Sequence, residues 1–131
     1  VARTGQAAFR PLYPLDWTIR RKIETVAREI YGADGVEYSR DAERAVDRME
    51  AIGLGGLPVC IAKTQYSLSD DPTLLGRPRG FHVTVSEVRP SAGAGFVVVL
   101  TGDIMTMPGL PRRPAAAAMR VEPDGTVHGL F

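Results

Sequence analysis

The sequence is poor in the residues that bind metal ions and form covalent cross-links. Its 131 residues include one cysteine, Cys60, and two histidines, His82 and His128. A single cysteine cannot form an internal disulfide, which is typical of a reducing compartment, so we expect a cytoplasmic protein. The spacing of these three residues places no two of them as ligands of one metal ion, and no metal site is expected from this chain alone.

The chain also lacks a marked excess of charge and a long hydrophobic run. Sixteen Lys and Arg residues stand against fifteen Asp and Glu, giving a formal net charge of +1. Nucleic acids and acidic membranes are bound by concentrated positive charge, so we expect neither partner. The apolar run at residues 96–100 has the length of a strand and falls far short of the roughly 20 residues of a membrane-spanning helix.

Familiar nucleotide-binding and catalytic motifs are missing as well. The sequence contains no Walker-type phosphate-binding loop and no G-x-S-x-G turn. Residues 53–58 read GLGGLP and are similar to a dinucleotide-binding motif, but Pro58 stands where the last glycine belongs. We interpret this segment as the end of a helix.

What is present suffices for a folded core, because 44% of the residues are hydrophobic and 24% charged. Two segments have the spacing of amphipathic helices, the first capped by Asp16 and followed by Gly32, the second capped by Ser39 and ended by Gly53. The expected buried positions are Ile19, Ile23, Val26, Ala27 and Ile30 in the first helix, and Ala42, Ala45, Val46, Met49 and Ile52 in the second.

Apolar runs and alternating patterns predict the strands. The run at residues 57–62 is typical of a strand covered on both faces, in which Cys60 is a small core residue. The other expected strands are residues 36–38, 81–88 and 96–101, with a terminal hairpin at 119–121 and 126–128. The helix between residues 36–38 and 57–62 favours a parallel crossover. We therefore predict an α/β fold, or α+β, with a mixed sheet, two main helices and a C-terminal hairpin.

Three loops next to the predicted strands could carry chemistry, and each has a plain structural alternative. Residues 63–71 leave the C-terminal end of a strand, where Lys63 could meet an anion or only solvate the strand end. Residues 90–95 could form an anion-binding turn or an ordinary tight turn between strands. Residues 101–111 could form an apolar rim for a flat heterocycle or for a partner surface, or only a loop stiffened by proline.

Longer strings in the chain resemble one enzyme family, formate–tetrahydrofolate ligase. They are LPVCIAKTQYS at 57–67, PSAGAGF at 90–96, TGDIMTMPGLP at 101–111, GLF at 129–131 and AREIYGADGV at 27–36. They follow one another in order over essentially the whole chain, which makes the likeness specific.

The resemblance implies a homotetrameric ligase that uses ATP and Mg²⁺. Such an enzyme converts formate to formyl phosphate and transfers the formyl group to tetrahydrofolate, giving 10-formyltetrahydrofolate. The family's glycine-rich phosphate loop lies in a large N-terminal domain and is missing here. We therefore expect residues 15–131 to be a single C-terminal domain of a larger P-loop-type ligase. Residues 1–14 would form an irregular strap at a truncated start, the missing N-terminal domains would be the partner, and the piece alone would be inactive.

Loop position and the resemblance together predict a set of residues that face nucleotide or folate. None of them is predicted to be catalytic. Lys63 is expected near the polyanion, and the apolar members of the set against an aromatic ring. The set is Lys63, Thr64, Gln65, Tyr66, Ser67, Leu75, Pro78, Met107, Pro108, Gly109 and Leu110. A structural or oligomer-assembly module, in which the strap or the first helix packs on another subunit, and a free-standing small-ligand-binding domain are the alternatives.

Overall fold

The computed structural model describes residues 8, 10–104 and 113–129. Along the chain the elements are α1 (Ile19–Val26), the π-helical turn η2 (Ala27–Tyr31), β1 (Gly35–Tyr38), α2 (Arg40–Ala51), the 3-10 turn η3 (Leu54–Gly56), β2 (Val59–Ala62), β3 (His82–Ser91), β4 (Phe96–Thr101), the 3-10 turn η4 (Ala115–Ala118), β5 (Arg120–Val121) and β6 (Val127–His128). The predicted α/β fold is confirmed, with a four-stranded mixed sheet, two main helices and a hairpin of β5 and β6. Among the described residues, none forms a helix of the length and apolar character needed to cross a bilayer.

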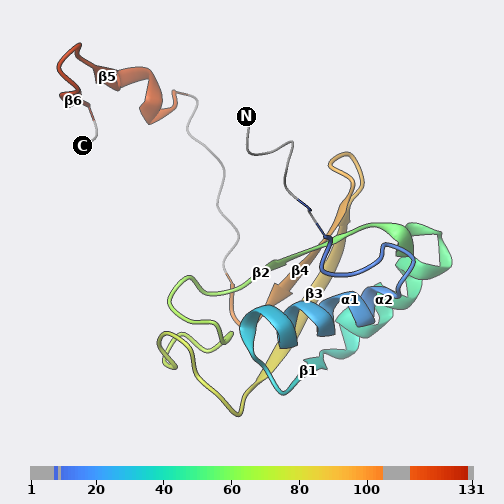
Figure 1. Ribbon diagram of the computed structural model, residues 1–131. Coiled ribbons are helices and arrows are strands. Elements are labelled where there is room, and N and C mark those ends of the chain that lie inside the picture. Colours follow the sequence, from blue (N-terminus) through green and yellow to red (C-terminus); the bar gives the residue numbers. More distant parts are fainter. Residues whose placement is uncertain (1–7, 9, 105–112, 130–131) are drawn as a thin grey trace.

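The sheet has the strand order β1-β3-β4-β2, and both helices pack on one of its faces (Figure 1). β1 is parallel to β3, β2 is parallel to β4, and the two central strands are antiparallel. β1 and β2 therefore run in opposite directions at opposite edges, and the expected parallel crossover through α2 is wrong. Parallel pairing occurs, but between strands that are not consecutive in the chain.

The core lies between the helices and the central strands. Buried side chains from both helices meet those of β3 and β4, and the members of this cluster are Ile19, Ile23, Ala42, Val46, Met49, Val85, Val88, Val97 and Val99. Two of the predicted helix termini are confirmed. Ser39 begins α2, and its Oγ accepts the N–H of Ala42. Gly32 ends the first helical segment with a φ of +75°. The first helix is capped by Thr18, whose side chain accepts the N–H of Arg21, so the assignment of Asp16 as the cap is wrong.

Two residues of the predicted buried stripes lie outside the core. Ile30 is 55% exposed, because the π-helical turn widens the helix after α1 and rotates later side chains away from the sheet. Ile52 is 64% exposed, because it follows the last turn of α2 and no longer faces the strands. The stripes correctly gave Ile19, Ile23 and Ala27 in the first helical segment.

β2 differs from the prediction in its environment. It is an edge strand, so its backbone pairs with β4 on one side only, and Cys60 points to the uncovered face of the sheet and is exposed. The expectation of a strand covered on both faces, with Cys60 in the core, is therefore wrong for this structure. At the start of β2, the hydroxyl oxygen of Tyr13 accepts the N–H of Val59 at 3.0 Å. Residues 10–14 contain no helix or strand, and the division into a strap and a domain stays a prediction.

A bulge in β3 explains the break in its alternating pattern. The pairing with β4 shifts between Val85 and Glu87. Ser86 fills the irregularity, and its hydroxyl donates to the carbonyl oxygens of Leu100 and Gly102 at 3.1 and 3.2 Å. This bulge lies at the end of the sheet where β4 leaves for Gly102.

Candidate functional site

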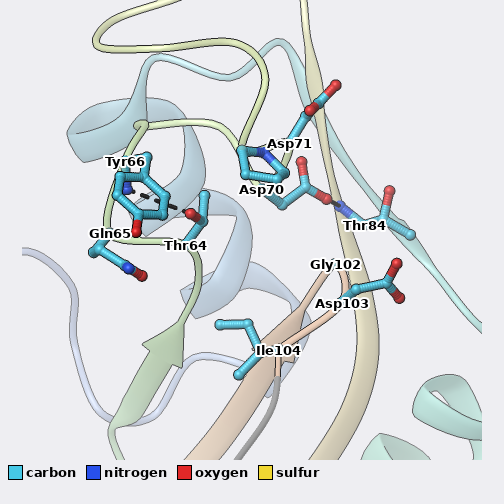
Figure 2. A pocket seen from close by; sticks show the side chains of 10 residues that line it. Thr64, Gln65, Tyr66, Asp70, Asp71, Thr84, Gly102, Asp103 and Ile104 are labelled. Atoms are coloured by element: carbon cyan, nitrogen blue, oxygen red, sulfur yellow. Dashed lines mark hydrogen bonds between the residues drawn. The ribbon is translucent and has the colours of Figure 1, made fainter.

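A cavity of about 840 Å³ opens at the carboxyl ends of β2 and β4. Because these strands are parallel, the loops that follow them meet at the same edge of the sheet, the edge at which α/β proteins commonly bind ligands. The lining residues come from the loop after β2, from β3 and from the segment after β4 (Figure 2): Thr64, Gln65, Tyr66, Asp70, Asp71, Pro72, Thr84, Gly102, Asp103 and Ile104.

Lys63 is the first residue of the loop after β2, and its ammonium group binds backbone carbonyl oxygens of the same loop. Its Nζ donates to the carbonyl oxygen of Thr64 at 2.8 Å and also to that of Ser67. The same ammonium lies 5.3 Å from the centre of the Tyr31 ring, within the range of a cation–π contact. Burial lowers the pKa of Lys63, and the negative charge of Asp70 opposes this change. Lys63 therefore shapes the loop and does not line the cavity.

Two buried serines turn the loop back toward the sheet. Ser67 Oγ accepts the N–H of Ser69 at 2.9 Å, and Ser69 Oγ accepts the N–H of Asp71 at 3.0 Å. Ser69 is only 1% exposed and Ser67 is also buried. Their hydroxyl groups are closed off from water, and these hydrogen bonds within the loop satisfy them. The spacing Ser67-Ser69-Asp71 is a local signal for such turns, and sequence reasoning missed it.

Asp70 joins this loop to the strands. Its Oδ2 accepts the backbone N–H of Thr84 in β3 at 2.7 Å. Gly102, directly after β4, donates its N–H to the carbonyl oxygen of Thr84 at 3.0 Å. A Cβ at Gly102 would lie 2.9 Å from the backbone oxygen of Asp70, so the absence of a side chain permits this close approach.

The charged residues among the described lining residues are all acidic: Asp70, Asp71 and Asp103. Asp71 Oδ1 accepts from the hydroxyl and the N–H of Thr73 at 2.7 and 2.8 Å, and these bonds lower the pKa of the Asp71 carboxyl. Within residues 8, 10–104 and 113–129, no group of three or more His, Cys, Asp or Glu side chains is placed to share a metal ion.

The structure brings some of the predicted site residues to the cavity and leaves others away from it. Thr64, Gln65 and Tyr66 line it. Leu75 is 72% exposed on the same loop, and Pro78 is half-buried; neither is a lining residue. Ser67 belongs to the internal hydrogen bonds of the loop. The predicted residues Met107, Pro108, Gly109 and Leu110 lie outside the described residues.

The glycine-rich segment at 90–95 lies at the other end of the sheet. Ala94 and Gly95 donate their N–H groups to the carbonyl oxygen of Ser91 at 3.0 and 2.9 Å, which closes a tight turn between β3 and β4. Of the two readings of this segment, the structure shows the ordinary turn.

Fold and cavity define an α/β domain with a candidate small-molecule site at the ends of two parallel strands. The comparison with protein families gives the particular group. The family model described as formate–tetrahydrofolate ligase matches residues 1–131, so the chain belongs to this family. This confirms the resemblance found in the sequence, and it gives the chain a function related to that of ligases acting on formate and tetrahydrofolate with the use of ATP.

Proposed function

We propose that this chain is the part of an ATP-dependent formate–tetrahydrofolate ligase that borders the substrate cleft. The enzyme would form 10-formyltetrahydrofolate, and the residues that bind the phosphates of ATP would lie in further sequence of the same enzyme. The observation that carries the proposal is the cavity at the ends of β2 and β4. Three of its lining residues, Thr64, Gln65 and Tyr66, belong to the string of residues 57–67 that resembles the family.

The chemistry requires activation of a poor acyl donor. A formate oxygen attacks the γ-phosphorus of ATP, ADP leaves, and formyl phosphate results. A nitrogen of tetrahydrofolate then attacks the formyl carbon, and inorganic phosphate leaves. The charge on the transferring phosphoryl group must be offset by cations. The acidic lining of the cavity would repel that group, so we assign phosphoryl transfer to residues outside the described cavity.

The same cavity is suited to an uncharged ring that carries N–H donors. The carboxylates of Asp71 and Asp103 can accept such donors, whereas Asp70 accepts from Thr84, and both adenine and the pterin of tetrahydrofolate present N–H donors. Exposed apolar side chains lie on the loop that borders the cavity, with Tyr66 62% and Leu75 72% exposed. They offer contact area for the flat face of a ring. In this proposal Lys63 acts through the shape of the loop, and the chain supplies one wall for a heterocyclic substrate.

The test compares the enzyme that contains this chain with the 131-residue chain alone. We expect the enzyme to form 10-formyltetrahydrofolate from formate, ATP and tetrahydrofolate, and the chain alone to form none and to bind ATP no more tightly than the millimolar range. Formation of 10-formyltetrahydrofolate by the isolated chain would contradict the proposal, and so would micromolar ATP affinity measured by calorimetry.

A substitution addresses the cavity directly. In the enzyme, Tyr66→Ala is expected to raise the KM of ATP or of tetrahydrofolate about tenfold, whereas Tyr66→Phe keeps the ring and should stay within about threefold. Equal kinetics for Tyr66→Ala and the unchanged enzyme would remove the cavity from the substrate cleft.

A role in assembly is the second candidate, favoured by the surface beside α1. A hollow of about 480 Å³ there is lined in part by Leu12, Trp17 and Arg21, and the Arg21 guanidinium lies 3.6 Å from the centre of the Trp17 ring. Leu15 is also exposed. Size-exclusion chromatography of the chain, alone and mixed with the rest of the enzyme, tests whether it associates; a chain that stays monomeric in both cases would contradict an assembly role.

A further inference from the structure

The loop of residues 64–76 is closed mainly on itself. Leu68 donates its N–H to the carbonyl oxygen of Gly76 at 2.8 Å, and Gly76 donates to that of Tyr66 at 3.2 Å. Further bonds join Ser67, Ser69 and Asp71 within the loop. These contacts give the loop a shape of its own, but they do not fix its position relative to the strands.

Among the hydrogen bonds of the described residues, one joins this loop to β3 or β4. It is the bond from the N–H of Thr84 to Asp70 Oδ2, 2.7 Å long (Figure 2). A short bond between a charged acceptor and a backbone donor is among the stronger hydrogen bonds of proteins. Lys63 holds Thr64 and Ser67 at the start of the loop, and the Asp70 carboxylate supplies the hydrogen bond that ties the loop to β3.

Two further observations show that the junction is closely fitted. Ser69 Oγ lies 3.4 Å from Asp70 Oδ1, so the carboxylate contacts groups on both of its oxygens. On the other side Gly102, with a φ of +59°, passes so near the Asp70 backbone that a Cβ would lie 2.9 Å from its oxygen. Gly102 in turn donates to the carbonyl oxygen of Thr84. Loop, β3 and the end of β4 thus meet at Asp70.

We infer that Asp70 is a positioning residue, which holds the rim of the cavity over the strand ends so that a heterocyclic substrate meets a preformed wall. This inference rests on the proposed function. Without the bond to Thr84, the loop keeps its internal turns but loses its fixed distance from β3, and the ring of the substrate must order the rim when it binds. The loss then falls on the binding of one ring-containing substrate, while formate, which has no ring to contact the rim, binds as before.

The experiment uses the enzyme that contains this chain, with Asp70→Ala and Asp70→Asn, and titrates ATP, tetrahydrofolate and formate separately. For Asp70→Ala we expect the KM of either ATP or tetrahydrofolate to rise about tenfold or more, with the KM of formate and kcat within about threefold. The substrate affected identifies the occupant of the cavity. Asp70→Asn keeps an oxygen acceptor for Thr84 and should stay within about threefold of the unchanged enzyme.

A matched control is Asp124→Ala in the turn between β5 and β6, where Asp124 Oδ1 accepts the backbone N–H of Thr126 at 2.9 Å. It removes the same type of bond in another part of the chain and should leave all three KM values unchanged. Hydrogen exchange in the enzyme supplies a second readout: Asp70→Ala should raise the exchange of the Thr84 amide, which loses its acceptor, and Asp70→Asn should not.

Several outcomes would overturn the inference. Unchanged KM values in Asp70→Ala show that the bond to Thr84 does not position the cleft, and an equal rise in all three KM values shows a general loss of structure. An Asp70→Asn variant as impaired as Asp70→Ala shows that the negative charge itself contacts the substrate. An unchanged enzyme without ligase activity contradicts the proposed function instead, so the two failures are distinguishable.

Discussion

The side chain of Lys22, in α1, is hydrogen-bonded to the backbone of Gly55, in the turn before β2. This side chain is completely buried, and its Nζ donates to the carbonyl oxygen of Gly55 at 2.6 Å and to that of Leu57 at 3.0 Å. These bonds tie α1 to the segment between α2 and β2. Burial lowers the pKa of the Lys22 ammonium, while Asp16 and Glu50 oppose this change.

Lys22→Met is expected to lower the free energy of unfolding by about 2 kcal/mol, because two buried carbonyl oxygens lose a charged donor. Urea denaturation of the purified protein measures it. Arg44→Met is the matched control, since Arg44 is 74% exposed in its pair with Asp41 and should change stability by less than about 0.5 kcal/mol. A Lys22→Met protein as stable as the unchanged one would show that these bonds are not needed.

Tyr38→Phe is expected to leave stability unchanged or to raise it by about 1 kcal/mol. The Tyr38 hydroxyl is buried and has no hydrogen-bond partner within the described residues. Its removal therefore eliminates the desolvation cost of a buried polar group that makes no hydrogen bond. The contact of the Arg20 guanidinium with this ring, at 5.2 Å, needs no hydroxyl and persists. Urea denaturation at neutral pH measures the change, and a loss above about 1 kcal/mol would indicate a partner for the hydroxyl.

The same variant predicts a change in alkaline stability. Burial raises the pKa of Tyr38 above its usual value of 10.0. Below pH 10 both states keep the phenol neutral; above it the unfolded chain releases its proton first, so stability falls as pH rises. Tyr38→Phe removes this contribution, and its stability should fall less steeply between pH 9 and 11, a range set by that value. Burial also raises the pKa of Tyr31, which remains in the variant, so part of the slope should persist. Equal slopes for the two proteins would contradict the prediction.

Gly102→Ala should cost more than Gly95→Ala. Both glycines have a positive φ, +59° and +75°, so both variants carry a backbone penalty of about 1 kcal/mol. A Cβ at Gly95 meets open space, whereas one at Gly102 meets the Asp70 backbone oxygen at 2.9 Å. We expect the Gly102 variant to lose at least about 1 kcal/mol more in urea denaturation, because a backbone atom cannot move aside as a flexible side chain can. Equal losses would show that the junction at Asp70 is loosely packed.

Cys60 should react with a thiol reagent in the folded chain. It lies on the edge strand β2 and is exposed, so a reagent such as a maleimide reaches it without unfolding. Mass spectrometry after labelling, with and without urea, measures the reaction. Labelling that requires urea would place Cys60 in a covered position.

Lys63→Ala in the enzyme is expected to lower kcat/KM by more than its loss of stability explains. Without the ammonium, the carbonyl oxygens of Thr64 and Ser67 lose their donor, and the rim of the cavity changes shape. Steady-state kinetics and thermal denaturation of the same preparations separate the two effects. Unchanged kinetics would remove Lys63 from the residues that shape the cleft.

Local patterns predicted the elements well where neighbouring residues decide them. Ser39 caps α2 and Gly32 ends the first helical segment, since caps depend on side chains within about one turn. The same reasoning chose Asp16 instead of Thr18 and missed the π-helical turn, so Ile30 was wrongly expected in the core. At the site, the position of a loop directly after a strand predicted three lining residues: Thr64, Gln65 and Tyr66. Thr84 lies within β3, and no local sequence pattern marks it as a lining residue.

The sequence alone determined that this is an α/β chain of the formate–tetrahydrofolate ligase family, because periodicity and long matching strings are properties of contiguous residues. Tertiary structure decided the rest: that β2 is an edge strand with Cys60 exposed, that Lys22 is buried, and that Asp70 meets Thr84 and Gly102. Burial and strand neighbours arise from contacts between segments far apart in the chain, and only the folded arrangement brings those segments together.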